Sequence, residues 1–437
     1  MSKRAPREIE LCVTDLMPDG TGVGQLDERV VQAKNALPGE LVSVKVLKRR
    51  RGIWYGEASA PAARAGWSSA RIEPACGYFP RCGGCAMQHI DYAEQLALKQ
   101  QQLTRALAAV GVEPQNINPP VQGPKLRYRT KARLGVRVVG GEVLVGFRET
   151  LSNRVARMES CETLIGEFSV LLKPLRQLIS SLSDPTRIPQ IELAAGDHEQ
   201  AIVVRHLDLL TEPDEELLRE FAIRHDIRVF AQSAGYDSVR LLSSHASRYL
   251  GYANVDYGLY YEFLPWDFTQ VNLAMNRLLV RSALAEFGRP DGGRVFDLFC
   301  GIGNFSLAAA SLGWSVTGYE AAAESIDRAV MNAERNGLSG RCEFQVADLY
   351  DPGCELAESA DYLLLDPPRS GAGPNLVTWL DSLRPRKVVY VSCQPASFAA
   401  DAAVLQEKGY LLERVGVFDM FPNTAHIETL GSFSRSW

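Results

Sequence analysis

The last third of the chain alternates short apolar runs with longer stretches of helical periodicity. The strand candidates cover residues 294–299, 315–320, 342–346, 362–366 and 387–392. Between them, residues 326–336 and 396–407 repeat apolar positions at helical spacing. Regular alternation of this kind predicts a doubly wound, mostly parallel α/β sheet over residues 266–437.

The beginning of the chain has short β-rich segments separated by turn sequences. Pro18-Asp19-Gly20 and Pro38-Gly39 are turn signals, and residues 41–46 carry β-branched side chains in partial alternation. We expect a small antiparallel barrel of the OB type over residues 1–65. This segment has 11 Lys and Arg against 8 Asp and Glu, largely through the run Lys48-Arg49-Arg50-Arg51. Contact with nucleic acid and a solvated hairpin both account for that run.

Residues 66–265 mix helical and strand patterns, which predicts a central α/β domain. Expected helices cover 91–110 and 215–225, and expected strands cover 191–193, 201–205 and 227–231. Residues 125–134 alternate cations with other residues, and we expect a strand there with its charge on one face. Tyr128 lies between the cations, where it suits either a stacked RNA base or an exposed sheet edge.

Composition and charge narrow the class of protein. The chain has 437 residues, which suits two to four domains, and its 46% hydrophobic and 23% charged residues are ordinary for a globular protein. With 47 Lys and Arg against 52 Asp and Glu, a uniformly basic coat is excluded, but a local basic face is not. No apolar run approaches the roughly 18 residues of a membrane helix. The charged start lacks an apolar signal segment, so we expect a cytoplasmic protein with no membrane partner.

A glycine-containing loop follows the first strand of the C-terminal α/β region. Residues 297–306 read D-L-F-C-G-I-G-N-F-S, and Glu320 ends the next strand about twenty residues later. Glycines let a ligand approach the backbone, and the acid can accept hydrogen bonds from both ribose hydroxyls. This pattern leaves NAD and S-adenosylmethionine open. Asp366-Pro367-Pro368-Arg369 at the fourth strand tip resembles the D-P-P loop of S-adenosylmethionine-dependent enzymes that act on nucleobases, which favours the second cofactor.

Two further residues suit covalent chemistry on a pyrimidine. Cys393 follows the fifth apolar run at its carboxyl end, where a thiol reaches a substrate beside the cofactor. Glu428 lies in a short apolar run, where burial would raise its pKa and suit it to proton exchange near neutral pH. A thiolate that adds to carbon 6 of uracil makes carbon 5 nucleophilic toward a methyl donor, and a base then removes the carbon 5 proton. A buried structural cysteine and an edge-strand acid are the alternatives.

These motifs together resemble the RNA uracil-5-methyltransferase family. The matching segments are Phe268-Thr269-Gln270-Val271-Asn272, residues 297–305, residues 366–369, Ser392-Cys393-Gln394-Pro395 and His426-Ile427-Glu428-Thr429. The resemblance implies a Rossmann-like class I methyltransferase domain with Cys393 as nucleophile and Glu428 as base. It also implies an S-adenosyl-L-methionine pocket lined by Gln270, Phe299, Asn304, Glu320, Asp348 and Asp366. Phe268, beside Gln270, is then a candidate platform for a flipped RNA base or a core residue.

Four cysteines form a second candidate site. Cys76, Cys82 and Cys85 lie within ten residues, and Cys161 follows further along the chain. Spacing alone leaves zinc and an iron–sulfur cluster open, whereas an odd total of nine cysteines argues against a disulfide framework. Residues 82–89 resemble the family's C-G-G-C-x-x-Q-H motif, which implies a [4Fe-4S] cluster with a structural role.

The N-terminal segment and the cysteines also indicate a branch of the family. Residues 8–60 resemble a TRAM domain, and a TRAM domain together with the cluster resembles the large-subunit rRNA enzymes, which implies 23S rRNA as partner and no DNA. Three rivals remain. They are an amino-methyltransferase, an RNA cytosine-5 methyltransferase, and a non-catalytic RNA-binding assembly factor. Methylation of another RNA, such as tRNA, is a further alternative.

Overall fold

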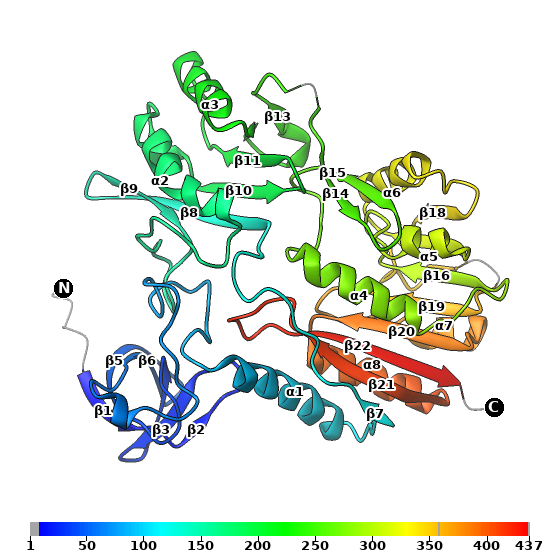
Figure 1. Cartoon of the computed structure of the whole chain (residues 1–437), viewed down its shortest axis with the longest axis horizontal. Helices are drawn as coiled ribbons and strands as arrows, with labels where there is room; N and C mark the ends of the chain where they lie inside the picture. The colour runs from blue at the N-terminus through cyan, green and yellow to red at the C-terminus, as the bar shows by residue number, and fades with distance from the viewer. Residues whose placement is uncertain (1–7, 246, 357–358, 436–437) are drawn as a thin grey trace.

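The protein is organised by three β-sheets and one two-stranded hairpin (Figure 1). The structure is a computed structural model that describes residues 8–245, 247–356 and 359–435. Residues 1–7 of the expected barrel segment therefore lie outside the described residues. Across the described parts of the chain, no helix is long and apolar enough to span a membrane.

Six strands near the N-terminus form a small curled sheet. They are β1 (Glu8–Cys12), β2 (Asp15–Leu16), β3 (Gly22–Leu26), β4 (Arg29–Lys34), β5 (Leu41–Arg50) and β6 (Ile53–Ser59). Their order is β1-β5-β6-β4-β3-β2, and every pair is antiparallel except β4–β6. A Cβ at Gly24 would lie 2.3 Å from the Cys12 carbonyl oxygen, so β3 crosses β1 closely and the sheet curls on itself. The expected antiparallel barrel is thus found, with one parallel pair.

A second six-stranded sheet forms the central region. It contains β8 (Lys131–Val139), β9 (Glu142–Gly146), β10 (Gln190–Ala195), β11 (Gln200–Arg205), β12 (Arg228–Gln232) and β13 (Arg240–Leu241). Their order is β13-β12-β11-β10-β8-β9. Helices α2 (Gly166–Ser181) and α3 (Glu212–His225) pack their apolar sides against it. Helix α3 begins with a capping box between Thr211 and Asp214 and connects β11 to its parallel neighbour β12.

The third sheet has eight strands and carries the C-terminal region. Its strands are β7 (Asn116–Ile117), β16 (Arg294–Leu298), β17 (Ser315–Glu320), β18 (Cys342–Val346), β19 (Tyr362–Leu365), β20 (Lys387–Ser392), β21 (Tyr410–Phe418) and β22 (Glu428–Arg435). The order is β18-β17-β16-β19-β20-β22-β21-β7, with parallel pairing from β18 to β20. From β16 the chain adds β17 and β18 on one side of the sheet, and then returns to add β19 and β20 on the other side of β16. This is the switch point at which open α/β sheets bind ligands.

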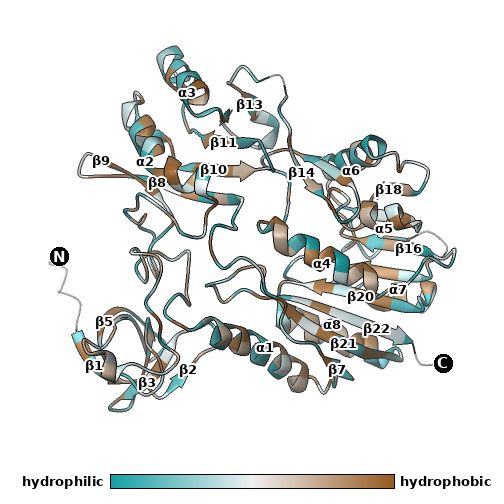
Figure 2. Ribbon diagram, in the orientation of Figure 1, coloured by the Kyte–Doolittle hydropathy of each residue, from teal (hydrophilic) through white to brown (hydrophobic). Residues whose placement is uncertain are grey.

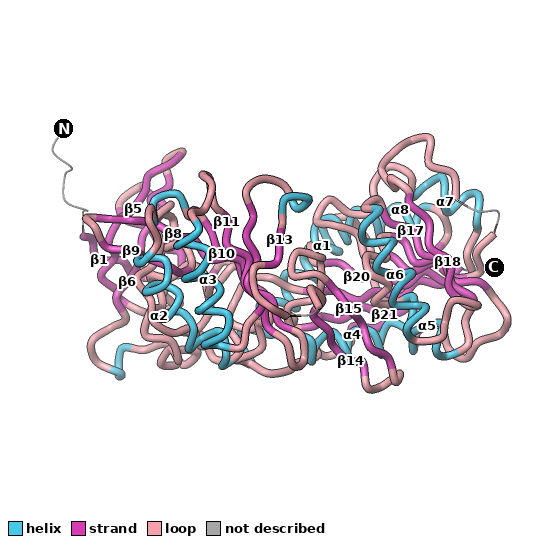
Figure 3. Tube along the Cα trace, turned by 90° about the horizontal axis from the view of Figure 1, so that it is seen from above, coloured by secondary structure: helices cyan, strands magenta, loops and turns pink. Residues whose placement is uncertain are grey.

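Helices cover both faces of the eight-stranded sheet. One face packs against α4 (Leu273–Ala285), α5 (Ser306–Leu312) and α6 (Ala323–Arg335). The other packs against α1 (Tyr92–Ala109), α7 (Leu376–Leu383) and α8 (Pro395–Glu407). Successive strand residues alternate between the two cores, as Val295 and Phe296 do. Helices α1 and α4 carry both apolar and polar segments in Figure 2, and Figure 3 shows this sheet at the opposite end from the barrel.

Segments from before residue 266 complete this third unit. Helix α1 packs on α8, and β7 extends the sheet beyond β21. The hairpin of β14 (Leu250–Asn254) and β15 (Leu259–Phe263) shares the core of α4. The side chains of Asn332 in α6 and of Asn336, the residue that caps its C-terminus, hydrogen-bond to the backbone of β15. Short 3-10 turns lie at Arg64–Gly66, Pro185–Arg187 and Tyr236–Ser238.

The basic segment before β8 differs from the expected strand. Residues 125–130 form an irregular loop in which Arg127 has a φ of 54°, and β8 begins only at Lys131. Tyr128 is 4% exposed, and its hydroxyl donates to the Pro422 carbonyl oxygen at 3.0 Å. The expectation that Tyr128 stacks on a base is therefore wrong, and so is the alternative of an exposed sheet edge protected by charge, because residues 125–130 form no strand. The Tyr128 side chain is buried against a loop almost 300 residues away in the sequence. The local charge pattern does not encode such a tertiary contact.

Candidate active site

Most of the expected catalytic and cofactor residues gather at one edge of the eight-stranded sheet. The carboxyl ends of β16, β17, β19 and β20 meet there because these strands are parallel. The glycine loop follows β16, Glu320 ends β17, Asp366 follows β19 and Cys393 follows β20. The sheet topology therefore brings together residues that are up to about a hundred positions apart in the chain.

The glycine loop makes a tight turn between β16 and α5. Phe299, Gly301 and Gly303 all have positive φ angles, of 67°, 54° and 87°. A Cβ at Gly303 would lie 2.4 Å from the Leu307 side chain, so only glycine fits there. Asn304 exchanges two hydrogen bonds with Asn276 of α4, at 2.9 and 3.0 Å. This reciprocal pair fixes the loop against the neighbouring helix.

Three carboxyl groups surround this loop. Glu320 accepts a hydrogen bond from the Gly301 amide at 3.3 Å. Burial raises the pKa of Asp297 to about 7, and its Oδ1 has no hydrogen-bond partner among the described residues. Burial, and then the charge of Asp297, raises the pKa of Asp366 to about 7. A cationic ligand would relieve this repulsion, and the sulfonium and ammonium groups of S-adenosylmethionine fit the site in that respect.

Gln270 lies just before α4, and Asp348 lies in the loop after β18. Gln270 is half-buried just before α4, and the backbone at Asp267 is held by Lys131, which donates to its carbonyl oxygen. Phe268 is 73% exposed, so core packing does not account for this ring. Asp348 is exposed after β18 and accepts a hydrogen bond from the Tyr350 amide at 3.0 Å.

Tyr350 is a residue of this edge that the sequence analysis missed. Its ring lies 5.9 Å from the Phe299 ring, centroid to centroid. Its hydroxyl lies 2.8 Å from the Ser370 hydroxyl and donates to the Gly371 carbonyl oxygen. Tyr350 thereby connects the loop after β18 to the D-P-P loop. No local motif distinguishes it from other tyrosines.

The strand register places Cys393 and Glu428 opposite each other. Strands β20 and β22 are antiparallel, and their last pair is Ser392 with Thr429. Cys393 and Glu428 are the next residues beyond that pair, where opposite side chains lie roughly 5 Å apart at Cβ. Burial raises the pKa of Cys393, and the charges of Glu428 and Asp366 raise it further. A thiol and a carboxyl group therefore face one another at the switch-point edge of the sheet.

Glu428 and Cys393 differ in their exposure and in the charges that affect their pKa values. Glu428 is only 3% exposed, and burial followed by the charge of Asp366 holds its pKa well above the usual range. Cys393 is half-buried, and the Arg369 guanidinium opposes the rise in its pKa. His426 lies 3.4 Å from Arg369 through Nδ1, and burial lowers its pKa. A neutral His426 can therefore accept a hydrogen bond from Arg369 and orient it.

Helix α1 anchors the loop that leads into Glu428, which the sequence analysis also missed. Lys99 forms a fully buried ion pair with Asp419 at 2.6 Å and donates to the Phe421 carbonyl oxygen. Gln95 accepts a hydrogen bond from the Asn423 amide at 3.0 Å. Polar residues at positions 95 and 99 on the buried stripe of α1 were the available signal. They indicate a partner inside the fold.

Replacement of Lys99 by methionine is expected to lower the free energy of unfolding by about 3–5 kcal/mol, because Asp419 would remain buried without its cation. Urea unfolding followed by circular dichroism measures this effect. The matched control is Lys173→Met on the exposed side of α2, for which we expect a change near zero. A loss below about 1 kcal/mol for Lys99→Met would show that Asp419 finds another partner.

The four cysteines of the second candidate site also lie near one another. Cys82 and Cys161 are buried, and Cys76 and Cys85 are half-buried. Burial, together with the charges of the other cysteines, raises the pKa of Cys82 to about 11 and of Cys85 to about 12. Gln88 donates to Cys85 Sγ at 3.2 Å and accepts from the Cys76 amide at 3.0 Å. In the described parts of the chain, no group of three or more His, Cys, Asp or Glu is arranged to hold a metal ion.

Sequence comparison defines the family of this protein. Residues 91–343 and 353–435 match the family described as tRNA (uracil-5-)-methyltransferase, and residues 6–60 match the TRAM domain. The chain belongs to the tRNA (uracil-5-)-methyltransferase family. This membership bears out the family resemblance inferred from the motifs at residues 268–272, 297–305, 366–369, 392–395 and 426–429.

Two relatives match nearly the whole chain. Both are named 23S rRNA (uracil(1939)-C(5))-methyltransferase RlmD. The Bordetella avium protein is 41% identical, with 97% of this chain and 90% of that protein covered. The Thiobacillus denitrificans protein is 43% identical, with 97% and 99% covered.

A solved structure shows the same fold. The Pyrococcus abyssi tRNA (uracil-54, C5)-methyltransferase, in complex with S-adenosyl-L-homocysteine, superposes with a TM-score of 0.75. It is 21% identical and is matched over 97% of this chain and 100% of its own. The family enzyme described here therefore shares the methyltransferase architecture of that protein.

Proposed function

We propose that this uracil-5-methyltransferase transfers a methyl group from S-adenosyl-L-methionine to carbon 5 of a uridine in 23S rRNA. The observation that supports the proposal is that Cys393 and Glu428 come directly after the last residue pair of β20 and β22, close enough for the charge of Glu428 to affect the pKa of Cys393. We infer the RNA, 23S rRNA, and the target nucleotide, uridine 1939, from the names of the relatives.

The proposed mechanism uses one nucleophile and one base. The Cys393 thiolate forms a bond to carbon 6, and the electron pair of the 5,6 double bond moves so that carbon 5 becomes nucleophilic. Carbon 5 then takes the methyl group. Glu428 removes the proton from carbon 5, the double bond re-forms, and Cys393 leaves carbon 6 as a thiolate. Burial raises the pKa of Glu428, so its carboxylate is a stronger base than an exposed one, and it then passes the proton to water.

The cofactor pocket is proposed from the residues at the same edge. Bound S-adenosyl-L-methionine supplies an electrophilic methyl group on a sulfonium. Glu320 is placed to accept hydrogen bonds from ribose hydroxyls, and Asp366 is placed to attract the cationic end. Phe299, which has a positive φ in the turn of the glycine loop, would offer a ring face. Asn304, Gln270 and Asp348 complete the proposed lining.

Cofactor affinity is expected to increase with pH around neutrality. Asp297 and Asp366 have pKa values of about 7, so they are largely protonated below pH 7 and attract a cation only above it. The dissociation constant of S-adenosylmethionine should therefore fall by about tenfold between pH 6 and pH 8. Isothermal titration calorimetry measures it, with Asp366→Asn expected to remove a large part of the dependence. A constant affinity across this range would contradict the proposed role of these carboxyl groups.

We propose that Cys76, Cys82, Cys85 and Cys161 hold a [4Fe-4S] cluster with a structural role. The donor chemistry supports this: four cysteines lie near one another, their thiolate forms would repel, and a soft metal centre would stabilise those thiolates. Iron and acid-labile sulfide analysis of anaerobically purified protein should give about four of each per chain, as that cluster type requires. Stoichiometric zinc without sulfide would contradict the cluster.

We further propose that the chain divides at residues 65 and 265, with α1, β7 and the β14–β15 hairpin contributing to the core of the third part. The TRAM barrel and the central domain would then bind the parts of the rRNA that lie outside the catalytic domain. Phe268 would provide a stacking face for the flipped uridine, since its exposed ring lies next to Gln270. We expect the protein to act on rRNA in the cytoplasm and to bind neither membranes nor DNA.

The basic tip of the barrel provides a test of RNA contact. Lys48, Arg49 and Arg50 lie exposed at the end of β5, and Arg49 stacks over Trp54 at 4.3 Å. Replacing all three with alanine should weaken binding of a 23S rRNA fragment and reduce the slope of log Kd against log salt by about 2–3. Fluorescence anisotropy at several salt concentrations measures both quantities. An unchanged slope would show that Lys48, Arg49 and Arg50 do not contact RNA phosphates.

Methylation of unmodified total RNA with radiolabelled cofactor tests the proposed function. Separation of the product nucleosides should yield 5-methyluridine confined to a fragment of 23S rRNA. 5-Methyluridine in tRNA would overturn the rRNA assignment while leaving the chemistry intact. Bound cofactor with no 5-methyluridine would favour an amino-methyltransferase or a non-catalytic RNA-binding protein.

A further inference from the structure

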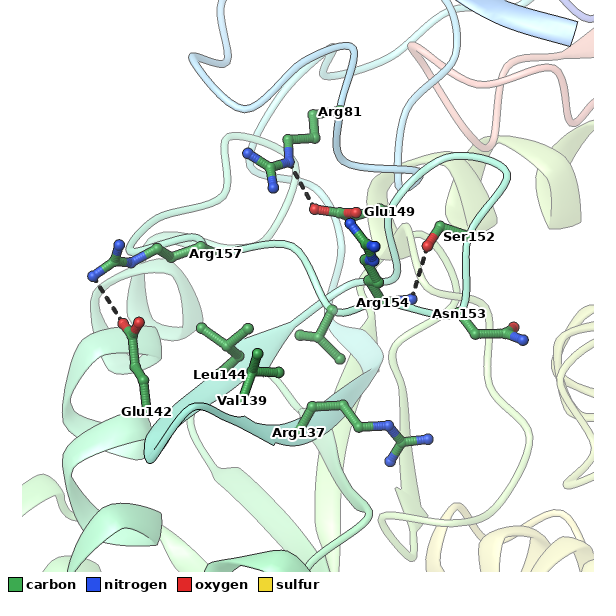
Figure 4. A pocket seen from close by; sticks show the side chains of 11 residues that line it. Arg81, Arg137, Val139, Glu142, Leu144, Glu149, Ser152, Asn153, Arg154 and Arg157 are labelled. Carbon is green, nitrogen blue, oxygen red and sulfur yellow. Dashed lines mark hydrogen bonds and ion pairs between the residues drawn. The ribbon is translucent and has the colours of Figure 1, made fainter. Parts of the chain in front are cut away.

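An open pocket of about 650 Å³ lies on the central sheet, apart from the residues of the proposed active site. Its lining comes from the segment before Cys82, from the β8–β9 hairpin and from the loop that follows β9 (Figure 4). In β8 and β9, Arg137 is paired with Leu144, and Val139 with Glu142. These four side chains share the outer face of the hairpin, because the alternate residues such as Val136 and Val143 point into the core.

Arginine side chains dominate the rim of this pocket. Arg81 and Arg157 are held by ion pairs with Glu149 and Glu142, at 2.7 and 2.8 Å (Figure 4). The side chains of both arginines are about two-thirds exposed, whereas Glu142 is 44% and Glu149 only 11% exposed. The Arg157–Glu142 pair is therefore a surface pair of the kind that contributes little stability. A phosphate can therefore replace the Glu142 carboxylate on Arg157 at small cost, with a planar fork of donors already in place.

The two other arginines of the pocket carry free positive charge. Across the described residues, Arg137 and Arg154 form no ion pair, and Arg137 uses one nitrogen to donate to the Val136 carbonyl oxygen at 3.0 Å. Both side chains are exposed. Four arginines and two glutamates leave the lining with a net charge of +2. The pocket therefore attracts anions, although the whole chain has a net charge of −5.

The floor of the pocket is apolar, which a site for a free inorganic anion would not need. Val139 is 62% exposed, and Leu144 and Val155 lie beside it. Apolar side chains beneath a ring of arginines suit a ribose or base below a phosphate. The volume falls in the range of pockets that hold molecules of this size.

The pocket is built onto the cysteine-bearing segment and adjoins the barrel. Thr150 donates to the Arg81 carbonyl oxygen at 2.9 Å, and Glu149 forms a β-bridge with Cys82. Glu57 of β6 is close enough for the charges of Arg81 and Glu149 to affect its pKa. The pocket therefore lies where the barrel, the cysteine segment and the central sheet meet.

We infer that this pocket binds one nucleotide unit of the RNA substrate, outside the target uridine, with Arg137 and Arg154 on phosphates and Val139 against the sugar or base. This inference rests on the proposed function for the identity of the RNA. A free mononucleotide offers the same chemistry. The RNA chain is favoured because the pocket is open and adjoins the TRAM barrel.

The test compares RNA binding by charge-matched variants of the full chain. Arg137→Ala with Arg154→Ala should weaken binding of a 23S rRNA fragment by about tenfold and lower its salt slope by about 1.4–1.8, as expected for two lost phosphate contacts. Arg105→Ala with Arg224→Ala removes the same charge from exposed sites on α1 and α3 and should leave both values near those of the wild type. Equal effects of the two double variants would overturn the inference.

A second pair of variants tests the floor without removing an arginine. Val139→Asp places a carboxylate in the pocket, whereas Val170→Asp places one on the exposed face of α2. Only Val139→Asp should weaken RNA binding, and circular dichroism should show both proteins folded. Saturable binding of uridine 5′-monophosphate that is lost in the Arg137/Arg154 variant, with RNA affinity unchanged, would assign the pocket to a free nucleotide and overturn the inference.

These binding measurements need no methyl transfer. Suppose that the wild type makes no 5-methyluridine but the Arg137/Arg154 variant shows the expected smaller dependence of RNA affinity on salt. The proposed function then fails and the pocket assignment stands. If methylation proceeds and the slope is unchanged, the pocket assignment alone fails.

Discussion

Replacement of Cys393 by alanine is expected to reduce 5-methyluridine formation by at least about 1,000-fold while leaving cofactor binding unchanged. The reason is chemical: without a sulfur bonded to carbon 6, carbon 5 of uracil has too little electron density to attack a methyl group. Transfer of radiolabelled methyl groups to a 23S rRNA fragment measures the loss, and calorimetry with S-adenosylmethionine provides the parallel binding value.

The matched control is Cys12→Ala, since Cys12 is an exposed thiol of the barrel strand β1. This control should keep full activity. A Cys393→Ala protein that still methylates within tenfold of the wild type would exclude covalent catalysis at this position, and with it the assignment of the β20 tip as the nucleophile site.

Replacement of Glu428 by glutamine is expected to stop the reaction after methyl transfer. Glutamine keeps the shape of the side chain but cannot remove the carbon 5 proton, so Cys393 cannot leave and the methylated RNA remains bonded to the protein. Turnover should fall by about 100- to 10,000-fold, and a covalent protein–RNA complex should accumulate. Denaturing gel electrophoresis detects that complex, and mass spectrometry shows whether it contains the methyl group.

The same variant should change the reactivity of Cys393 in a defined direction. The charge of Glu428 raises the pKa of Cys393, so its removal should lower that pKa and move the alkaline rise of iodoacetamide labelling to lower pH. Glu343→Gln, on the exposed side of β18, is the control and should change neither turnover nor labelling. Normal release of product by Glu428→Gln would assign the base to another residue.

Local sequence patterns predicted the strands of the methyltransferase sheet well. Residues 315–320, 342–346 and 387–392 form β17, β18 and β20 at the expected positions. A buried parallel strand such as β20 is a nearly continuous apolar run, so its ends can be located from the sequence alone, whereas β18 is largely exposed. The residues at strand tips, Glu320, Asp366 and Cys393, could be proposed as a group for the same reason.

Contacts between distant segments could not be predicted in this way. The facing of Cys393 and Glu428 depends on the antiparallel pairing of β22 with β20, which neither strand encodes alone. Tyr128 looked accessible in a charged run but is buried against Pro422. The support of the Glu428 loop by Lys99 likewise requires helix α1 to join a sheet formed some 300 residues later. Local charge and periodicity carry no information on such pairings.

The most direct test of the central claim uses 23S rRNA fragment in which the target uridine carries fluorine at carbon 5. Glu428 cannot remove fluorine as it removes a proton, so the reaction should stop with the RNA bonded to the protein. Peptide mapping of that complex by mass spectrometry should place the methylated nucleotide on Cys393 through carbon 6. A nucleotide bonded to another residue, or the absence of any adduct from an enzyme that methylates the unmodified fragment, would contradict the account.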